Sequence, residues 1–423
     1  MNERNSIIGK IDWVTLLIYL TLVLIGWLSI FSARYDESHP SIFDMSQVYG
    51  KQLIWIGASL LIGFIILLID AKFFNAFSLW IYIAVLASLF MVLVYSKATK
   101  GATSWIDLGG GIKLQPSEFA KMATALAVAG YLDRLDVDLQ KRKDQIVTVA
   151  LILIPMVLVL LQNDTGSAIV FVSFIFILYR EGFPGTGLAL VAGVVAIVLF
   201  IFTLLWTQRV MYVVLGSLFV LTLTYYLLNK KKDIITMVAV FMAMFAFVFS
   251  VDYAFNHVLQ DHQRSRIEIL LGMRDDPKGD GYNVHQSKIA IGSGGFTGKG
   301  FLEGTQTKYD FVPEQHTDFI FCTIGEEGGF IGTSAVVLLY VALLIRIIIL
   351  AERQRSTFSR VYGYAIAGIF FVHFAINIGM TIGLMPVIGI PLPFLSYGGS
   401  SMMAFSMMLA IFLKQDAYRL NVL

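Results

Sequence analysis

Cysteine is almost missing from this sequence of 423 residues, and charged residues are scarce. The only cysteine, Cys322, cannot form a disulfide within the chain, and its apolar surroundings favour a small packing residue. Charged residues make up 14% of the chain, and 31 basic against 29 acidic residues leave a net charge of +2. That balance is too small to indicate a nucleic-acid partner.

Several motifs of soluble enzymes are missing too. The chain has no Walker A loop and no GxGxxG stretch after a strand, which argues against nucleotide binding. Its scattered histidines lack metal-ligand spacing, so a structural metal site is not expected. The first residues lead straight into an apolar run without a small-residue cleavage site, and we expect a first membrane span there instead of a removed signal peptide.

Long apolar runs dominate the rest of the chain, which is 57% hydrophobic. Because such runs cross lipid as helices, the sequence predicts an all-α polytopic membrane protein, with residues 1–423 forming one integral membrane domain. Taking about 20 residues for each span, we expect about twelve spans: Trp13–Phe31, Gln52–Ile69, Ala76–Tyr95, Ser117–Tyr131, Ile146–Leu161, Gly166–Tyr179, Gly187–Trp206, Val210–Leu228, Ile234–Val251, Phe319–Leu350, Val361–Leu384 and Leu395–Leu413.

The basic residues of the short loops predict the orientation. They fall on one side, which should be cytoplasmic and should hold both termini: Arg134, Lys141, Arg142, Lys143, Lys230, Lys231, Lys232, Arg353, Arg355, Arg360, Lys414 and Arg419. The large loop 253–317 then lies outside. It should begin with a charged helical piece and continue as irregular, glycine-rich backbone. Residues 207–252 are expected to form an inserted transmembrane hairpin.

Polar residues near the predicted outer ends of two spans have two interpretations each. A helix should begin at Pro116 or Ser117, and Glu118 and Lys121 then share one face. A buried pair of this kind is more often scaffold than catalyst, but it could shape a polar cavity. Asp164 could cap the next helix, or it could line the same cavity.

Three further regions could carry chemistry. Arg264, Arg266, Lys288, Lys299 and Lys308 of the large loop are either solvated charges or an anion-binding group. Asp318, at the border between polar loop and apolar run, could act as a general base; the alternative is that Thr317 or Asp318 caps the helix. The proline- and glycine-rich stretch from Met385 to Met403 predicts a broken segment beside a cavity, as in transporters.

Five segments together resemble the SEDS family (shape, elongation, division and sporulation), most closely its rod-shape (RodA) branch: QPSEFAK, QNDTGSA, QSKIAIGSGGFTGKGF, EQHTDFIF and PLPFLSYGGSS. The resemblance covers most of the chain. It implies a multi-pass protein of the bacterial cytoplasmic membrane, a peptidoglycan glycosyltransferase that polymerises lipid II on the outer face for cell elongation and rod shape. It also implies a class B penicillin-binding protein as partner.

The same resemblance implies roles for individual residues. Asp318, in the family's HTDF motif, is the expected catalytic carboxylate. Residues expected to line the cavity or bind substrate are Gln115, Ser117, Glu118, Lys121, Asp164, Arg266, Lys288, Ser396, Tyr397, Ser400 and Ser401. The chain departs from the family in two ways, because Ser104 stands where an arginine usually precedes the tryptophan, and the family usually has ten spans.

We therefore hypothesise an inverting glycosyl transfer in which Asp318 takes the proton of an acceptor sugar hydroxyl. The diphosphate leaving group needs positive charge, from Arg266, Lys288 or a divalent cation such as magnesium or manganese. The alternatives are a lipid II flippase with Asp164, Glu118 and Asp318 as a relay, and a non-enzymatic scaffold for the crosslinking partner. The flippase is less favoured, because most of these charges lie at one predicted depth.

Overall fold

The computed structural model describes residues 8–187, apart from 37, 40, 96–103 and 108–112, together with 261–270 and 281–419 and the single residues Met242, Tyr253, His257 and Met273. Its contacts divide the chain into two compact units, one formed by Met1–Pro184 and Asn283–Leu423 and the other by Gly185–Tyr282. Each unit is described by itself, and the candidate site lies in the first.

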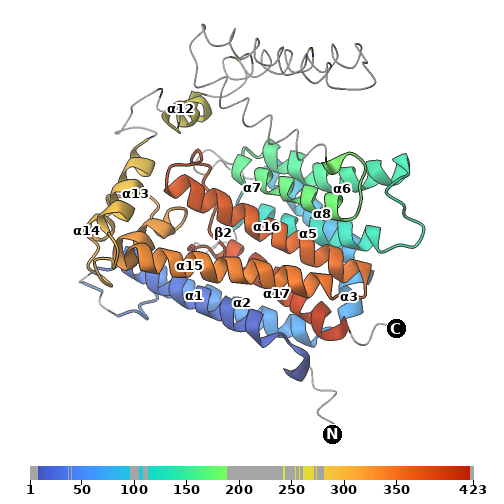
Figure 1. The fold of residues 1–423 in the computed structure, drawn as a ribbon, viewed down its shortest axis with the longest axis horizontal. Coiled ribbons are helices and arrows are strands. Elements are labelled where there is room, and N and C mark those ends of the chain that lie inside the picture. The colour runs from blue at the N-terminus through green and yellow to red at the C-terminus, as the bar shows by residue number, and fades with distance from the viewer. Residues whose placement is uncertain are drawn as a thin grey trace, which may run out of the picture. The chain divides into compact units, whose positions relative to one another are not determined.

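The first unit is a bundle of helices (Figure 1). Within the described residues, six helices are long and apolar enough to cross a membrane: α1 (Trp13–Ala33), α2 (Val48–Leu68), α4 (Ser78–Tyr95), α6 (Arg142–Leu161), α15 (Ile320–Glu352) and α16 (Thr357–Thr381). Three less apolar stretches complete it: α5 (Pro116–Leu132), α17 (Gly399–Tyr418) and the run made by α7 (Thr165–Val170), η3 (Phe171–Ser173) and α8 (Phe174–Arg180).

Each of the nine predicted spans that the structure describes coincides with one of these helical stretches, which confirms the all-α membrane fold. The other three, between residues 187 and 251, lie outside the described residues except for Gly187 and Met242. They include the predicted hairpin 207–252. The count of twelve spans and the hairpin therefore stay predictions.

The helices with the most small and polar residues lie at the centre. α5 is buried along most of its length, since alanines let neighbouring backbones approach closely, and it packs against α4 and α16. α17 packs against α2, and α16 is the most buried of the six long apolar helices. The more apolar α2, α4 and α6 leave most of their side chains exposed or half-buried, as expected of helices that face lipid.

The loops contain short elements that the sequence analysis did not predict. These are η2 (Ile8–Lys10), α3 (Ala71–Ala76), α13 (Tyr282–Ser293), α14 (Thr305–Lys308) and a two-stranded antiparallel sheet of β1 (Ile106–Asp107) and β2 (Lys113–Leu114). The sheet leads directly into α5. The charged helical piece expected at the start of the large loop is confirmed as α12 (Asp261–Leu270), in the second unit.

The glycine-rich loop after α13 packs on a kink in α15. Gly329, with φ 59° and ψ −156°, interrupts the helix, and the loop donates backbone hydrogen bonds to the carbonyl oxygens of Glu326 and Glu327 beside it. A Cβ on Gly294 or Gly298 would lie about 2 Å from a carbonyl oxygen of α15. Close backbone approach therefore requires glycine at these two positions.

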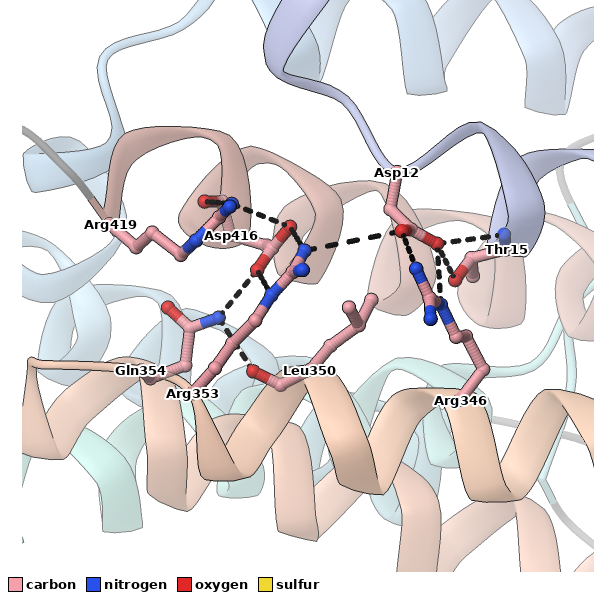
Figure 2. Close-up of polar contacts among 8 residues, drawn as sticks. All are labelled: Asp12, Thr15, Arg346, Leu350, Arg353, Gln354, Asp416 and Arg419. Carbon is pink, nitrogen blue, oxygen red and sulfur yellow. Dashed lines mark hydrogen bonds and ion pairs between the residues drawn. The ribbon is translucent and has the colours of Figure 1, made fainter.

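The opposite end of α15 joins the start of α1 to the end of α17 through ion pairs (Figure 2). Nε of Arg346 donates to Oδ2 of Asp12 at 3.1 Å, and Nε of Arg353 donates to Oδ1 of Asp416 at 2.8 Å. We call Asp12, Arg346, Arg353, Asp416 and Arg419 the terminal ion cluster. It places the start of α1 and the end of α17 at one end of the bundle. That this end is cytoplasmic stays a prediction.

Candidate active site

The sequence-predicted residues gather at the end of the bundle away from the terminal ion cluster. α1 runs from Asp12 in that cluster to Arg34, whose Nε donates to Nδ1 of His316 at 3.2 Å, two residues before Asp318. The starts of α5, α7, α15 and α17 and the end of α16 supply the residues described below. Arg266 belongs to the second unit and is not placed relative to them.

The helix cap predicted at Asp164 is confirmed, and the same side chain contacts the start of α5. Its Oδ1 accepts a hydrogen bond from the backbone N–H of Ser167 at 3.0 Å and so caps α7. Its Oδ2 accepts from Nε2 of Gln115 at 2.9 Å and from Oγ of Ser117 at 3.0 Å. One carboxylate therefore starts one helix and fixes the first turn of α5.

Glu118 and Lys121 form the predicted ion pair on α5. Nζ of Lys121 lies 2.8 Å from Oε2 of Glu118, and both side chains are almost fully buried. Nζ also lies 2.9 Å from Nε2 of His373 on α16 and 5.2 Å from the ring centre of Phe405. Two charges this deep need each other, since either one alone would be costly to bury.

His373 and Asn377, one turn apart on α16, were missed by the sequence analysis. Nδ1 of His373 lies 3.0 Å from the carbonyl oxygen of Pro391, to which it can only donate, so Nε2 is left to accept from the Lys121 ammonium. Nδ2 of Asn377 donates to the carbonyl oxygens of Ile390 at 2.7 Å and of Asp318 at 2.8 Å. The available signal was an ionisable residue inside an apolar span.

His373 and Asn377 bind an irregular piece of backbone between α16 and α17. We call it the 388–391 segment (Ile388, Gly389, Ile390 and Pro391). The broken stretch predicted here from its prolines and glycines is confirmed. A Cβ on Gly166, two residues after Asp164, would lie 2.8 Å from the side chain of Ile390, so the start of α7 also packs on this segment.

Asp318 lies against the same segment. A Cβ on Gly389 would lie 3.3 Å from Oδ2 of Asp318, so the carboxylate is next to this backbone. Gly389 has φ 76°, a conformation that favours glycine. The interpretation of Thr317 or Asp318 as a helix cap is wrong, because α15 begins after Phe319 without a side-chain cap and Oγ1 of Thr317 donates to Glu314. Asp318 itself is half-buried.

The serines and tyrosine of the SYGGSS motif are mostly structural. Oγ of Ser396 accepts from the backbone N–H of Leu392 at 2.8 Å, and the backbone N–H of Tyr397 donates to the carbonyl oxygen of His316 at 2.9 Å. Oγ of Ser400 accepts from the backbone N–H of Gln115 at 3.0 Å, and Oγ of Ser401 donates to the carbonyl oxygen of Gly398 at 3.2 Å. These bonds hold the start of α17 against the HTDF motif and α5.

Lys288 is an exposed cation beside this end of α16. A Cβ on Gly383, just after α16, would lie 3.7 Å from its Nζ. Oγ of the preceding Ser287 is fully buried and donates to the carbonyl oxygen of Thr381 at 2.9 Å, which fixes α13 on α16. Lys299, by contrast, pairs with Glu326 at 2.6 Å and serves the glycine-rich loop.

The described side chains do not form a complete set of ligands for a divalent cation. In that part of the chain, no three His, Cys, Asp or Glu residues are grouped so that they could hold a metal ion. Magnesium sites usually combine one or two carboxylates with oxygen ligands from substrate and water, so Asp318 could supply one ligand but could not hold the ion by itself. We therefore assign no step to a cation, and the magnesium or manganese ion stays a prediction.

Comparison with known proteins extends over nearly the whole chain. The model of the FtsW/RodA/SpoVE family, described as "Cell cycle protein", matches residues 12–217 and 210–420. The chain belongs to this family. The predicted family is thereby confirmed.

Two relatives in the FtsW/RodA/SpoVE family are similar along most of their own length. "Peptidoglycan glycosyltransferase MrdB" of Escherichia coli (strain K12) is 34% identical, over 93% of this chain and 90% of that protein. "Peptidoglycan glycosyltransferase RodA" of Treponema pallidum (strain Nichols) is 33% identical, over 93% of this chain and 95% of that protein.

Solved structures share the fold. A chain from "Structural coordination of polymerization and crosslinking by a peptidoglycan synthase complex" aligns with a TM-score of 0.69 and 27% identity, over 97% of this chain and 99% of that one. The crystal structure of the rod shape determining protein RodA of Thermus thermophilus aligns with a TM-score of 0.62, over 97% of both chains. At 23% identity, the second likeness supports the fold alone.

Proposed function

We propose that this member of the FtsW/RodA/SpoVE family is a peptidoglycan glycosyltransferase of cell elongation, embedded in the bacterial inner membrane. The observation that carries the proposal is its 33–34% identity, over nine-tenths of each chain, to two proteins that bear that name. The buried ion pair, the two half-buried aspartates and the broken segment provide the polar end that such a reaction needs.

The proposed reaction joins lipid II units on the outer face of the membrane. Asp318 accepts the proton of an acceptor sugar hydroxyl while that oxygen bonds to the anomeric carbon of the donor, and the bond from that carbon to the lipid diphosphate breaks. General-base help of this kind contributes roughly 10²- to 10⁴-fold to the rate. Support comes from the position of Asp318, half-buried at the start of α15 against the backbone of Gly389.

Positive charge must balance the diphosphate that leaves. Lys288 is exposed on α13 beside the end of α16 and is the candidate among the described residues of the first unit. Arg266 and a divalent cation remain alternative sources of this charge. Lys121 is not suited to the task, because its ammonium is fully buried against Glu118 and His373.

A class B penicillin-binding protein is the proposed partner. The similarity to a chain of a peptidoglycan synthase complex, in which polymerisation and crosslinking are coordinated, supports an assembly of this type. The partner would act on the same side of the membrane as Asp318, since a crosslinking enzyme needs the newly made strand.

The flippase alternative predicts a relay of ionisable groups through the membrane. Among the described residues, the buried ionisable side chains lie toward the two ends of the bundle. The site end holds Glu118, Lys121, His316, Glu326 and His373, and the end with the terminal ion cluster holds Asp12, Asp144, Lys414 and Asp416. This distribution favours chemistry at one end over transport across the bundle.

The deciding experiment incubates the purified protein and its crosslinking partner with lipid II in detergent, where transport has no meaning. We expect glycan polymer from the wild type and at least a 100-fold lower rate from Asp318→Ala, in line with the loss of a general base. Asp36→Ala is the matched control, since Asp36 is an exposed loop aspartate and the variant should stay active. A wild type that makes no polymer, or an Asp318→Ala that makes as much, would overturn the assignment.

A further inference from the structure

Asp318 and the buried Glu118–Lys121 pair are connected through the hydrogen bonds of His373 and Asn377 and the backbone of the 388–391 segment. Lys121 donates to Nε2 of His373, and Nδ1 of His373 donates to the carbonyl oxygen of Pro391. The next residue back, Ile390, is held by Asn377, and Gly389 lies against the Asp318 carboxylate. Three consecutive residues of the 388–391 segment therefore each touch a different part of this arrangement.

Asn377 joins the backbone of Asp318 to the 388–391 segment. Its amide nitrogen donates to the backbone carbonyl of Asp318 itself and to that of Ile390. A single donor group thus sets the distance between the residue before α15 and the backbone that Asp318 faces. Both Asn377 and His373 are fully buried, so water does not compete for these bonds.

An irregular segment has no helix or sheet hydrogen bonds of its own to keep its shape. Its carbonyl groups must find partners elsewhere, and two polar side chains on one face of α16 provide them. A catalytic group usually has to be held within a fraction of an ångström, and a shift of about 1 Å can cost about 100-fold in rate. The segment next to Asp318 is therefore a place where small displacements would matter.

We propose that His373 and Asn377 are positioning residues, which hold the 388–391 segment against Asp318 and so set the direction in which its carboxylate reaches the acceptor. The role rests on the proposed function, since the reaction gives Asp318 its task. The working contact of His373 is the one from Nδ1 to Pro391, and the contact from Lys121 fixes which ring nitrogen carries the proton.

Two substitutions of His373 separate these contacts. The amide of asparagine can take the place of Nδ1 and still donate to Pro391, whereas the longer glutamine places its amide near Nε2 and keeps only the contact with Lys121. Asparagine is the smaller of the two and leaves unfilled space in a fully buried site. Packing alone therefore predicts that His373→Gln is the better variant, and positioning predicts the reverse.

We expect His373→Asn to polymerise lipid II within about threefold of the wild type, and His373→Gln to lose about 10- to 100-fold in kcat with little change in KM. His373→Asn should nevertheless unfold at the lower temperature. Asn377→Asp, which keeps the shape but points a carboxylate at two carbonyl groups, should lose at least as much activity as His373→Gln. Equal activity of the two His373 variants, or activity that follows the unfolding temperature, would overturn the proposal.

A measurement that needs no activity distinguishes failure of this proposal from failure of the proposed function. Hydrogen exchange of the peptide around residues 388–392 should quicken in His373→Gln and Asn377→Asp and stay near the wild-type rate in His373→Asn. If exchange quickens in this pattern but the wild type makes no polymer, the proposed function is wrong, and His373 and Asn377 still hold the 388–391 segment. If the wild type makes polymer and exchange is unchanged in His373→Gln, only the positioning role is wrong.

Discussion

The two charged regions at opposite ends of this helix bundle use different chemistry. The terminal ion cluster joins arginines to aspartates. Arg346 and Arg353 each meet a carboxylate through two nitrogens, and Arg353 also lies 4.0 Å from Asp12. The site end pairs a lysine with a glutamate beside His373, and there Asn377 and Gln115 are neutral donors to the backbone of Asp318 and to the carboxylate of Asp164.

This contrast separates the region that holds the protein together from the region that works. Arginine stays charged and its planar fork fixes two bonds at once, which suits a permanent clamp between chain start and chain end. Neutral donors orient a carboxylate without cancelling its charge. Asp164 is held in this way by Gln115 and Ser117. Changes at the first end should therefore alter stability, and changes at the second should alter stability and activity together.

Lys121→Met should have the largest effect on stability. It leaves Glu118 buried without its ion-pair partner, and breaking a buried pair from one side costs about 3–5 kcal/mol. It also removes the donor to His373, so polymerisation per folded molecule should fall. Unfolding in mixed micelles and polymer formation from lipid II would measure the two effects, and the double variant Glu118→Gln/Lys121→Met should recover most of the stability. If the double variant were no more stable than Lys121→Met, the unpaired Glu118 carboxylate would not be the cause of the lost stability.

Asp416→Asn should cost less and act on stability alone. The carboxylate is fully buried, but its partner Arg353 is partly exposed, so water takes over some of the lost interaction. We expect a loss of about 2 kcal/mol in the free energy of unfolding. Activity per folded molecule should stay within about twofold of the wild type, since the site lies at the other end. A fall of much more than twofold in activity per folded molecule would show that the terminal ion cluster also affects the reaction, which contradicts the contrast between the two ends.

The smallest effect is expected from acid. Burial raises the pKa of Asp12, but hydrogen bonds from Arg346 and Thr15 and the Arg346 charge outweigh it and lower the pKa from 3.8 to about 2. Because the folded-state pKa is the lower one, this stabilisation is complete above about pH 4 and is lost as pH falls toward 2. The stability difference between wild type and Asp12→Asn should shrink over that window. If the stability difference between the two proteins did not change with pH, the cluster would not lower the pKa of Asp12.

Local patterns allowed much of the site to be predicted. Glu118 and Lys121 are three residues apart on one helix, and Asp164 precedes its own helix by one residue, so both contacts follow from helix geometry. His373 escaped because its partners, Lys121 and Pro391, depend on how α5, α16 and an irregular segment pack. The strands β1 and β2 escaped for another reason, since two residues each are too short to show a pattern.

The terminal ion cluster shows a second limit of sequence. The spacing of Arg346 and Arg353 is typical of cytoplasmic anchors of a span, and Asp12 is typical of the start of another, yet no pattern indicates that they meet. The partners are more than 300 residues apart in the chain. Only the packing of α15 along α1 brings them together.

One helix carries both regions, and its length acts as a gauge. α15 has 33 residues, and its part after the kink at Gly329 is long enough by itself, at 1.5 Å a residue, to cross a bilayer core about 30 Å thick. Arginines anchor its C-terminal part, and Asp318, just before its first residue, contacts Asn377 and Gly389. One residue more or fewer between Gly329 and Arg346 would shift the kink by about 1.5 Å and rotate it by about 100° relative to the arginines. The residue count between anchor and carboxylate thus sets the height at which the glycan strand would be built.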